Sequence, residues 1–409
     1  KRVCIVGGGF GGLYTALNLA KLQRLQGEDK AQVTVIDVND RFVFLPMLYE
    51  LVTGELKDWE VAPVFTDLLK GSGVRFIHGK VAGRNADNKT LAVSVASVAG
   101  GGEEEVAYDH LVIALGSQST ADRVEGAAEH AIPFVSVKDA QRLRERIDQL
   151  LANGKQASAV VVGGGYSGVE LACNLKDRFG DKAKVSLVHR GDKCLEPAQD
   201  YSRDSGARRM AGLGVRALMR TGVEAVGPSS ITLKGDDGET REEDCDVCVW
   251  TAGVRASDQA EALGFATTEE GRVKVSPRLR VHGEEGVFAL GDIAESRDAL
   301  SDRAAATAQV ALQQADTVAW NIHADITGGV PVNFRYHDLG EMLSLGNAAA
   351  SLASPLFGLE ARGELAHALR RGVYLLRMPT VRHKARVGRS WAGRLPGELL
   401  RQMAKGGKS

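Results

Sequence analysis

Residues 3–12 read VCIVGGGFGG, a run of apolar, mostly β-branched side chains that turns through glycines into a helical pattern beginning at Leu13. The arrangement returns at residues 159–168, which read AVVVGGGYSG, so that Gly163 lies 156 residues beyond Gly7. In such a strand–turn–helix unit the glycines let the backbone approach a pyrophosphate, and the helix N-terminus presents free N–H groups to it. Two glycine turns without a ligand would be the alternative. Two copies, each in the right context, indicate a protein that holds two dinucleotides.

The residue after the second strand of each unit distinguishes the two sites. In the first unit this residue is Asp37, 25 residues beyond the last glycine of the motif, where a carboxylate can accept hydrogen bonds from a ribose 2′-OH. The second unit has His189 and Arg190 at this point, with Lys193 close behind and no acid. The first site therefore suits the adenosine of FAD, and the second can take NADPH as well as NADH. A solvated loop charge is the alternative for Arg190.

Composition is that of a large α/β enzyme. The chain has 409 residues, of which 44% are hydrophobic and 48 are glycines, so two or three domains are expected. A formal net charge of -1 argues against nucleic-acid binding, and no metal site is predicted. No uncharged apolar run reaches the roughly 18 residues that a transmembrane helix needs. The sequence begins at Lys1, inside the first strand pattern, so no targeting segment can be read from it.

Matching strand endings extend the duplication. Residues 109–116 (DHLVIALG) and 246–253 (DVCVWTAG) are both buried strand patterns that run into a glycine turn. A Val-rich hairpin with a polar turn at Gly100–Glu103 is predicted over residues 91–106, a short strand ends at Asp292, and a helix is expected from Arg303 to Trp320. The predicted order is first FAD segment (1–120), NAD(P) domain (121–253), second FAD segment (254–330) and C-terminal region (331–409).

The five cysteines are expected to be reduced and mostly structural. No CxxxxC pair follows the first unit, where residues 40–50 carry no sulfur. Cys245 and Cys248 form a CxxC in a strand pattern, and alternation would place positions three apart on opposite faces, a poor geometry for a disulfide. Electrons leaving a flavin are thus expected to pass directly to an acceptor.

These motifs together resemble a known family. The arrangement is similar to the two-dinucleotide flavoprotein fold of glutathione reductase-like enzymes, and within it to type II NAD(P)H dehydrogenases, the single-subunit quinone reductases of membrane surfaces. The more specific motifs are LPMLYE at residues 45–50, GVELA at 168–172 and TAQVALQQ at 307–314. Residues 340–346 (GEMLSLG) and 374–380 (YLLRMPT) resemble the plant and cyanobacterial C branch. The resemblance implies non-covalent FAD, NADPH or NADH as donor, a prenyl-quinone (plastoquinone or naphthoquinone type) as acceptor, and a plastid, thylakoid or plastoglobule membrane surface.

Four polar residues carry the predicted chemistry. Asp292, at a strand end, can accept hydrogen bonds from ribityl or phosphate-side hydroxyls, unless it only caps a helix. Glu170 lies on the first turn of the helix after the second glycine loop; by resemblance it approaches nicotinamide and flavin, whereas a dipole-stabilised surface carboxylate is the alternative. Gln309 and Gln313 are four residues apart and share a helix face, where amides suit a quinone carbonyl. Ordinary helix polarity is the alternative for both.

The motifs and the resemblance together give four sets of site residues. The expected FAD residues are Gly7, Gly9, Gly12, Asp37, Arg41, Pro46, Val81, Ala114, Gly116, Gly291, Asp292 and Gln309. The expected NAD(P) residues are Gly163, Gly165, Gly168, Glu170, His189, Arg190 and Gly253. The quinone tunnel is expected to be lined by Leu45, Pro46, Leu48, Tyr49, Gln309, Leu312 and Gln313. The catalytic residues are expected to be Glu170, Gln309 and Gln313.

The C-terminal segment predicts contact with an anionic membrane surface. From Pro355 to Ser409 it holds 12 Lys and Arg and three acids, a balance of 12 − 3 = +9. Leucines and a valine recur at helical spacing over residues 365–376 with arginines between them, and Trp391 and Leu395 follow. Amphipathic basic segments of this kind lie in the headgroup plane. The same tail would also suit packing on the protein or on a second copy in a homodimer.

Two other functions stay in view. A soluble NAD(P)H-dependent reductase of a ferredoxin-like protein acceptor would share both glycine loops, but the basic tail and the glutamine segment speak against it. A non-catalytic, nucleotide-sensing interaction protein is disfavoured by Glu170 and two intact loops. Sulfide:quinone reductases share the outline but need positioned cysteines.

Overall fold

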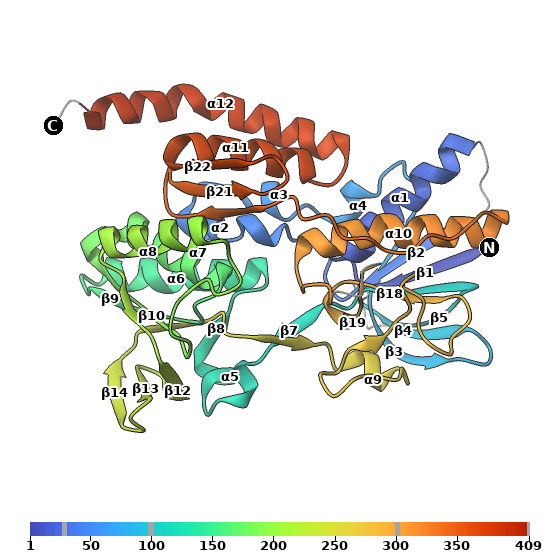
Figure 1. The fold of residues 1–409 in the computed structure, drawn as a ribbon, viewed down its shortest axis with the longest axis horizontal. Helices are drawn as coiled ribbons and strands as arrows, with labels where there is room; N and C mark the ends of the chain where they lie inside the picture. The colour runs from blue at the N-terminus through green and yellow to red at the C-terminus, as the bar shows by residue number, and fades with distance from the viewer. Residues whose placement is uncertain (27–30, 97–101, 299–302, 407–409) are drawn as a thin grey trace. The chain divides into compact units, whose positions relative to one another are not determined.

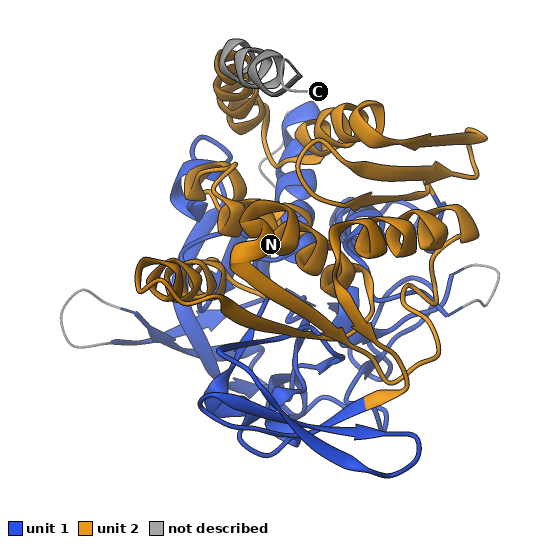
Figure 2. Ribbon diagram, turned by 90° about the vertical axis from the view of Figure 1, so that its left-hand side faces the viewer, with its two compact units in different colours: residues 1–43, 64–134, 222–338 blue, residues 44–63, 135–221, 339–409 orange. Residues whose placement is uncertain are grey.

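The computed structural model describes residues 1–26, 31–96, 102–298 and 303–406. The chain forms two compact units, each assembled from three separate stretches (Figure 2). Unit 1 comprises residues 1–43, 64–134 and 222–338, and unit 2 comprises residues 44–63, 135–221 and 339–409. The domain boundaries predicted from the motifs, near residues 120, 253 and 330, stay predictions.

A seven-stranded sheet forms the centre of unit 1 (Figure 1). Its strands lie in the order β18 (Val287–Ala289), β6 (His110–Ile113), β1 (Arg2–Val6), β2 (Gln32–Asp37), β3 (Arg75–Asn85), β4 (Thr90–Val95) and β5 (Gly102–Ala107). The strands from β18 to β3 are parallel, and β4 and β5 add an antiparallel hairpin. The predicted hairpin is therefore confirmed. Of its predicted turn, Gly100 and Gly101 lie outside the described residues.

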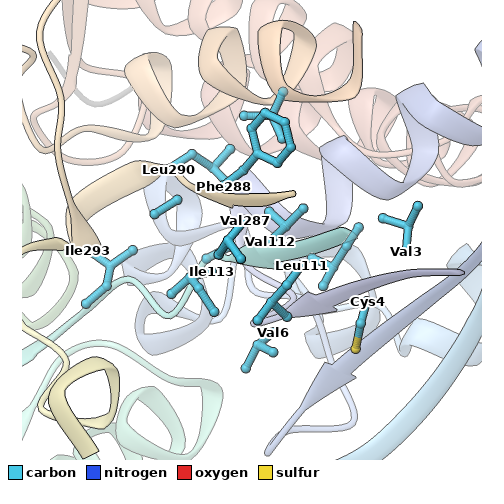
Figure 3. Close-up of a cluster of buried hydrophobic side chains, with 14 of the residues drawn as sticks. Val3, Cys4, Val6, Leu111, Val112, Ile113, Val287, Phe288, Leu290 and Ile293 are labelled. Atoms are coloured by element: carbon cyan, nitrogen blue, oxygen red, sulfur yellow. The ribbon is translucent and has the colours of Figure 1, made fainter. Parts of the chain in front are cut away.

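The central strands β6 and β18 are buried throughout and β1 is buried after Arg2, as expected of parallel strands covered on both faces. Ile5, Leu111, Val112 and Phe288 are fully buried in one cluster that β1, β6 and β18 share (Figure 3). Two helices, α1 (Phe10–Gln26) and α10 (Ala308–Thr327), lie side by side in this unit.

Helix α10 differs in its limits from the predicted helix of residues 303–320. Thr307 is its N-cap, and the Thr307 side chain accepts a hydrogen bond from the Val310 N–H at 3.2 Å. Gly328 ends the helix in the left-handed conformation, with φ of 78°. A threonine cap and a glycine stop therefore set the boundaries, which the apolar pattern alone placed too early.

Smaller elements complete unit 1. The short helices are α4 (Phe65–Leu68), α5 (Ala127–His130) and α9 (Gln259–Ala262), with 3-10 turns η2 (Ala121–Arg123) and η4 (Gly291–Ile293). The paired strands are β7 (Ser117–Ser119) with β16 (Val254–Ala256), β8 (Ala131–Pro133) with β15 (Val247–Trp250), and β17 (Val273–Lys274) with β19 (Ala294–Glu295). A further sheet has the order β12 (Thr221–Val226), β13 (Ser230–Gly235) and β14 (Thr240–Asp244).

Unit 2 repeats the strand–turn–helix plan. The parallel strands β9 (Ala157–Val162), β10 (Ala183–Val188) and β11 (Arg216–Leu218) pair in the order β11-β10-β9. Its helices are α6 (Val137–Ala152), α7 (Tyr166–Phe179) and α8 (Asp200–Leu213), with the turn η3 (Gly180–Lys182). Ser136 and Asp139 form a capping box that starts α6.

The C-terminal stretch of unit 2 forms a small sheet and two helices. The sheet has the order β20 (Glu341–Ser344), β21 (Ala350–Ser354) and β22 (Leu359–Arg362), followed by α11 (Gly363–Arg377) and α12 (Val381–Gly406) (Figure 1). The stretch 44–63 adds η1 (Leu45–Met47), α2 (Tyr49–Thr53) and α3 (Asp58–Val61). In the part of the chain that the structure describes, no helix is long and apolar enough to cross a bilayer.

Candidate functional site

The first glycine loop has the geometry of a pyrophosphate cradle. A Cβ on Gly12 would lie 1.8 Å from the Gly7 carbonyl oxygen, so the helix can approach the turn only with glycine there. The Asp37 carboxylate accepts the Gly8 N–H at 2.6 Å and holds the loop. A Cβ on Gly9 would meet nothing within 4 Å, which leaves the crest of the loop open. A phosphate group fits against such a crest.

The second loop repeats this construction with one change. Gly163 donates its N–H to Val188 O at 2.8 Å, matching the 2.8 Å bond from Gly7 to Ile36 O. Gly164 then donates its N–H to His189 Nδ1 at 3.2 Å, so His189 takes the part that Asp37 has in the first loop. A Cβ on Gly165, like one on Gly9, would meet nothing within 4 Å.

The acceptor in the second loop is thus an imidazole nitrogen and not a carboxylate oxygen. A histidine at this position places no negative charge beside a 2′-phosphate. Arg190 and Lys193 are exposed in the same segment. The missing acid at this position is visible in the sequence, whereas the hydrogen bond that the imidazole accepts is not.

In unit 1, the turn that carries Asp292 is held by a residue that the sequence analysis missed. Gln314 is fully buried; its Oε1 accepts the Gly291 N–H at 2.7 Å and its Nε2 donates to Ser296 Oγ at 2.7 Å. Ser117 Oγ donates to Asp292 Oδ2 at 2.7 Å. In the sequence, the only signal for Gln314 is its place directly after the predicted site residue Gln313. The structure adds that its amide is buried and hydrogen-bonded at both ends, which fixes the turn.

The two predicted glutamines of α10 lie on a partly buried face. Gln313 donates from Nε2 to His337 O at 2.9 Å and accepts the His337 N–H on Oε1 at 2.9 Å. Both ends of this amide are therefore engaged with the backbone before β20. Contact of Gln309, Leu312 and Gln313 with a quinone stays a prediction.

The predicted residues are divided between the two units. Unit 1 holds Gly7, Gly9, Gly12, Asp37, Arg41, Val81, Ala114, Gly116, Gly253, Gly291, Asp292, Gln309, Leu312 and Gln313, and unit 2 holds Leu45, Pro46, Leu48, Tyr49, Gly163, Gly165, Gly168, Glu170, His189 and Arg190. Within unit 1 the Ala114 carbonyl oxygen lies 2.2 Å from where a Gly7 Cβ would be, so Ala114 backs the first loop.

Glu170 and Tyr49, which the sequence analysis placed in different sets, lie together in unit 2. Glu170 is 8% exposed, and its Oε1 accepts the Ser344 N–H at 2.8 Å and the Tyr49 hydroxyl at 3.3 Å. Burial raises the pKa of Glu170 to about 7, although the Ser344 N–H and Arg370 pull it down. Glu170 is therefore a buried, protonatable group, and its interpretation as a surface carboxylate is wrong.

Arg370 of α11 completes this cluster. Its side chain is fully buried, donates from Nη1 to the Tyr49 hydroxyl at 2.8 Å, and forms an ion pair with Glu50. Burial raises the pKa of Glu50, but Arg370 and Arg371 lower it by more, so Glu50 stays ionised. The signal for a buried cation was Glu50 itself, an acid within the apolar run of residues 45–52.

The ion pairs correct the charge count of the C-terminal segment. Arg371 pairs with Glu55 at 3.0 Å, and Arg394 pairs with Glu60 at 2.6 Å. Three of the 12 basic residues, counting Arg370, therefore pair with acids of the stretch 44–63 and are not free to meet lipid. Basic side chains were assigned to the surface because charge patterns do not show which acids they reach. Leu395, Arg401, Lys405 and Lys408 lie outside the described side chains.

The exposed apolar residues of α11 support the amphipathic pattern. Leu365, Leu369 and Leu376 are 65%, 37% and 73% exposed, whereas Ala366, Arg370 and Tyr374 are buried. The three leucines form a stripe on α11, here called the α11 leucine stripe. One face of this helix thus packs inside unit 2 and another is apolar and exposed.

The five cysteines are buried free thiols. The prediction that Cys245 and Cys248 face opposite ways is wrong, because β15 begins at Val247 and Cys245 precedes it. The two thiols are hydrogen-bonded to each other, and this contact and burial raise the pKa of Cys248. Alternation along a strand does not apply to a residue outside it.

Comparison with known proteins identifies the family. Residues 1–315 match the family described as pyridine nucleotide-disulphide oxidoreductase. The chain is 37% identical over 405 residues to demethylphylloquinone reductase NdbB of Synechocystis sp., covering 98% of each. It is 38% identical over 418 residues to the alternative NAD(P)H-ubiquinone oxidoreductase C1, chloroplastic/mitochondrial, of Arabidopsis thaliana, covering 95% of this chain and 80% of that one. The chain belongs to the type II NAD(P)H dehydrogenases of this family, in the plant and cyanobacterial branch.

The type II dehydrogenase fold is also seen in solved structures. The structure of NDH2 from Plasmodium falciparum in complex with NADH has a TM-score of 0.84 at 17% identity, covering 96% of this chain and 98% of that one. The predicted α/β fold with two dinucleotide-binding parts is confirmed, and the enzyme is FAD-dependent and uses NAD(P)H.

Proposed function

We propose that this enzyme passes electrons from NAD(P)H through FAD to a prenyl-quinone, of the naphthoquinone or plastoquinone type, at a membrane surface. The observation that carries the proposal is the buried, protonatable Glu170 on the helix that follows the second glycine loop. Reduction of a quinone to a quinol consumes protons, whereas an iron–sulfur acceptor takes electrons alone. The names of the two relatives, a demethylphylloquinone reductase and an NAD(P)H-ubiquinone oxidoreductase, support a quinone acceptor.

The residues of the first loop fit a resident FAD. Gly9 faces open space, and Asp292 lies on a turn that Gln314 holds. The Asp37 carboxylate accepts the Gly8 N–H on Oδ2 and the Asn39 N–H on Oδ1, so it lies between the loop and the segment after β2. These residues, with Gly7 and Gly12, would hold pyrophosphate, ribose and ribityl hydroxyls. Bound FAD supplies hydride acceptance from the nicotinamide and electron transfer to the acceptor.

Glu170 would supply a proton during quinone reduction. With a pKa of about 7 the carboxyl group is about half protonated at neutral pH, which is the condition under which a general acid works well. Tyr49 of α2, Leu45 and Pro46 of η1, and Leu48 between these two elements would contact the quinone by resemblance to the family. Of these, Leu45 is 43% exposed and Leu48 is buried.

Steady-state oxidation of NADPH tests the proposed acceptor. We expect rapid turnover with a short-chain naphthoquinone and little with a ferredoxin, at equal enzyme and FAD content. Faster reduction of ferredoxin than of quinone would reject a quinone acceptor in favour of the soluble reductase.

Reversal of the Arg190 charge should change nucleotide preference. Arg190→Glu is expected to raise the KM for NADPH about tenfold, and that for NADH little, because a charge-assisted contact to a 2′-phosphate is lost. The measurement is KM for both nucleotides with the same quinone. Arg208→Glu on α8, also exposed, is the matched control. An equal change for both nucleotides would assign Arg190 to the solvated surface.

The exposed α11 leucine stripe is the proposed contact with the membrane. Replacing Leu365, Leu369 and Leu376 with Gln removes apolar area without removing a charge, and should weaken binding to anionic liposomes roughly tenfold to a hundredfold. Sedimentation with liposomes measures the binding. Val330→Gln with Val332→Gln, also exposed, is the control.

Liposome sedimentation, together with the mass of the protein in solution, distinguishes a membrane contact of the stripe from a homodimer contact. If the triple variant still sediments with liposomes as the wild type does, but its mass in solution falls from dimer to monomer, the stripe covers a second copy. The name of the Arabidopsis relative, which reads chloroplastic/mitochondrial, is compatible with a plastid membrane.

A further inference from the structure

A chain of hydrogen bonds in unit 2 connects Arg370 to Glu170 through one hydroxyl group. Arg370 Nη1 donates to the Tyr49 oxygen at 2.8 Å, and the same oxygen lies 3.3 Å from Glu170 Oε1. A tyrosine hydroxyl has a single hydrogen, and a guanidinium can only donate. The hydrogen of Tyr49 therefore cannot point at Arg370 and is directed to the carboxyl oxygen.

We propose that Arg370 is a positioning residue that turns the Tyr49 O–H toward Glu170 Oε1, so that the proton of Glu170 is carried on Oε2. The inference rests on the proposed function, in which Glu170 supplies a proton to the acceptor. Oε1 already accepts two hydrogen bonds, from the Ser344 N–H at 2.8 Å and from Tyr49. Protonation at Oε1 would break one of them, whereas protonation at Oε2 keeps both.

The surroundings of Glu170 explain why this arrangement needs an arginine paired with an acid. Charged and titratable groups of three helices interact with Glu170: Tyr49 and Glu50 of α2, Arg370 and Tyr374 of α11, and Cys173 of α7. Burial raises the pKa of Tyr374 and of Cys173, so both are neutral in the pH range where Glu170 titrates. Arg370 keeps its charge at every pH of interest, so the direction of the Tyr49 hydroxyl does not change during turnover. Glu50 balances that charge, which allows Glu170 to become neutral.

The decisive variant is Tyr49→Phe, read by infrared spectroscopy of the resting holoenzyme without donor or quinone. The carboxylic C=O band that disappears in Glu170→Gln identifies Glu170, and its pH titration gives the pKa. A hydrogen bond to Oε1 favours the charged form, so its loss should move the titration upward by roughly half a unit to one unit. Tyr374→Phe, at another buried tyrosine beside Arg370, should leave the titration in place, because burial raises the pKa of Tyr374 and its hydroxyl is neutral where Glu170 titrates.

The double change Glu50→Gln with Arg370→Gln tests whether Arg370 acts through Tyr49. It keeps the pair neutral and hydrogen-bonded, and should move the Glu170 titration upward when Tyr49 is present but little in the Tyr49→Phe background. An unmoved titration in Tyr49→Phe, or an equal shift from the double change in both backgrounds, would overturn the positioning role. FAD content and melting temperature monitor folding.

The infrared result does not depend on the acceptor. If turnover with quinone fails while the Glu170 band shifts as expected, the proposed function is wrong and the positioning of Tyr49 stands. If quinone turnover is normal while the band does not move in Tyr49→Phe, only the positioning role is lost.

Discussion

Glu170→Gln is expected to slow reduction of quinone at least about a hundredfold, because it removes a general acid, whose usual contribution is about 10²- to 10⁴-fold. Reduction of the flavin by NAD(P)H should change far less, since the glycine loops and Asp292 are untouched. Stopped-flow absorbance separates the two half-reactions. The wild-type rate of quinone reduction should fall as the pH rises through about 7, where Glu170 loses its proton, and the variant should lose this pH dependence.

Stability should show the same titration with a defined sign. Folding raises the pKa of Glu170 from 4.5 to about 7, so the folded state binds the proton more tightly than the unfolded state. The contribution of this proton to stability is complete below about pH 4.5 and is lost as the pH rises to about 7. Glu170→Gln should flatten the dependence of the melting temperature on pH between about pH 4.5 and pH 7. A quinone rate that is unchanged, or that keeps its fall near pH 7, would remove Glu170 from proton transfer.

Arg370→Met is expected to destabilise the protein by about 3–5 kcal/mol, because it leaves the buried Glu50 without its principal partner. Glu50→Leu with Arg370→Met removes both charges and should recover most of the lost stability, since apolar pairs of similar volume replace buried ion pairs well. Thermal and urea unfolding of the FAD-loaded protein measure both variants. A single variant as stable as the double would mean that Glu50 is ionised without help from Arg370.

The same ion pairs affect how membrane binding should be tested. Removing all residues after 355 would take away Arg370, Arg371 and Arg394, and would leave Glu50, Glu55 and Glu60 unpaired. Such a truncation would weaken unit 2 as well as any contact with lipid. Substitutions in the α11 leucine stripe avoid this problem because those side chains are exposed.

Local patterns were enough to predict both glycine loops. A strand, a glycine turn and a helix are neighbours in sequence, so Gly7–Gly12 and Gly163–Gly168 could be assigned from spacing alone. The Val-rich hairpin was predictable for the same reason. The limits of α10 were harder to predict, because the Thr307 cap and the Gly328 stop set them and the spacing of apolar residues does not.

The contacts of Glu170 could not be predicted from local patterns. Tyr49 is 121 residues before it and Arg370 is 200 residues after it, and nothing in the spacing connects them. Charge counting even assigned Arg370 to a lipid surface. An ion pair between distant segments depends on the tertiary fold. Until its partner is known, a basic residue in an amphipathic helix can be interpreted as a surface residue that faces lipid or as a buried member of an ion pair.

The two glycine loops differ in how firmly they are held, and this suits ligands that stay for different times. The Asp37 carboxylate accepts a hydrogen bond of 2.6 Å from its loop, whereas a ring nitrogen of His189 accepts one of 3.2 Å. Charged hydrogen bonds are shorter and stronger. A cofactor that stays bound benefits from a rigid binding loop, because rigidity slows its dissociation. A nucleotide substrate must leave once in every catalytic cycle, which a more weakly held loop permits. We therefore expect the difference between Asp37 and His189 to contribute to a longer residence of FAD than of NAD(P)H.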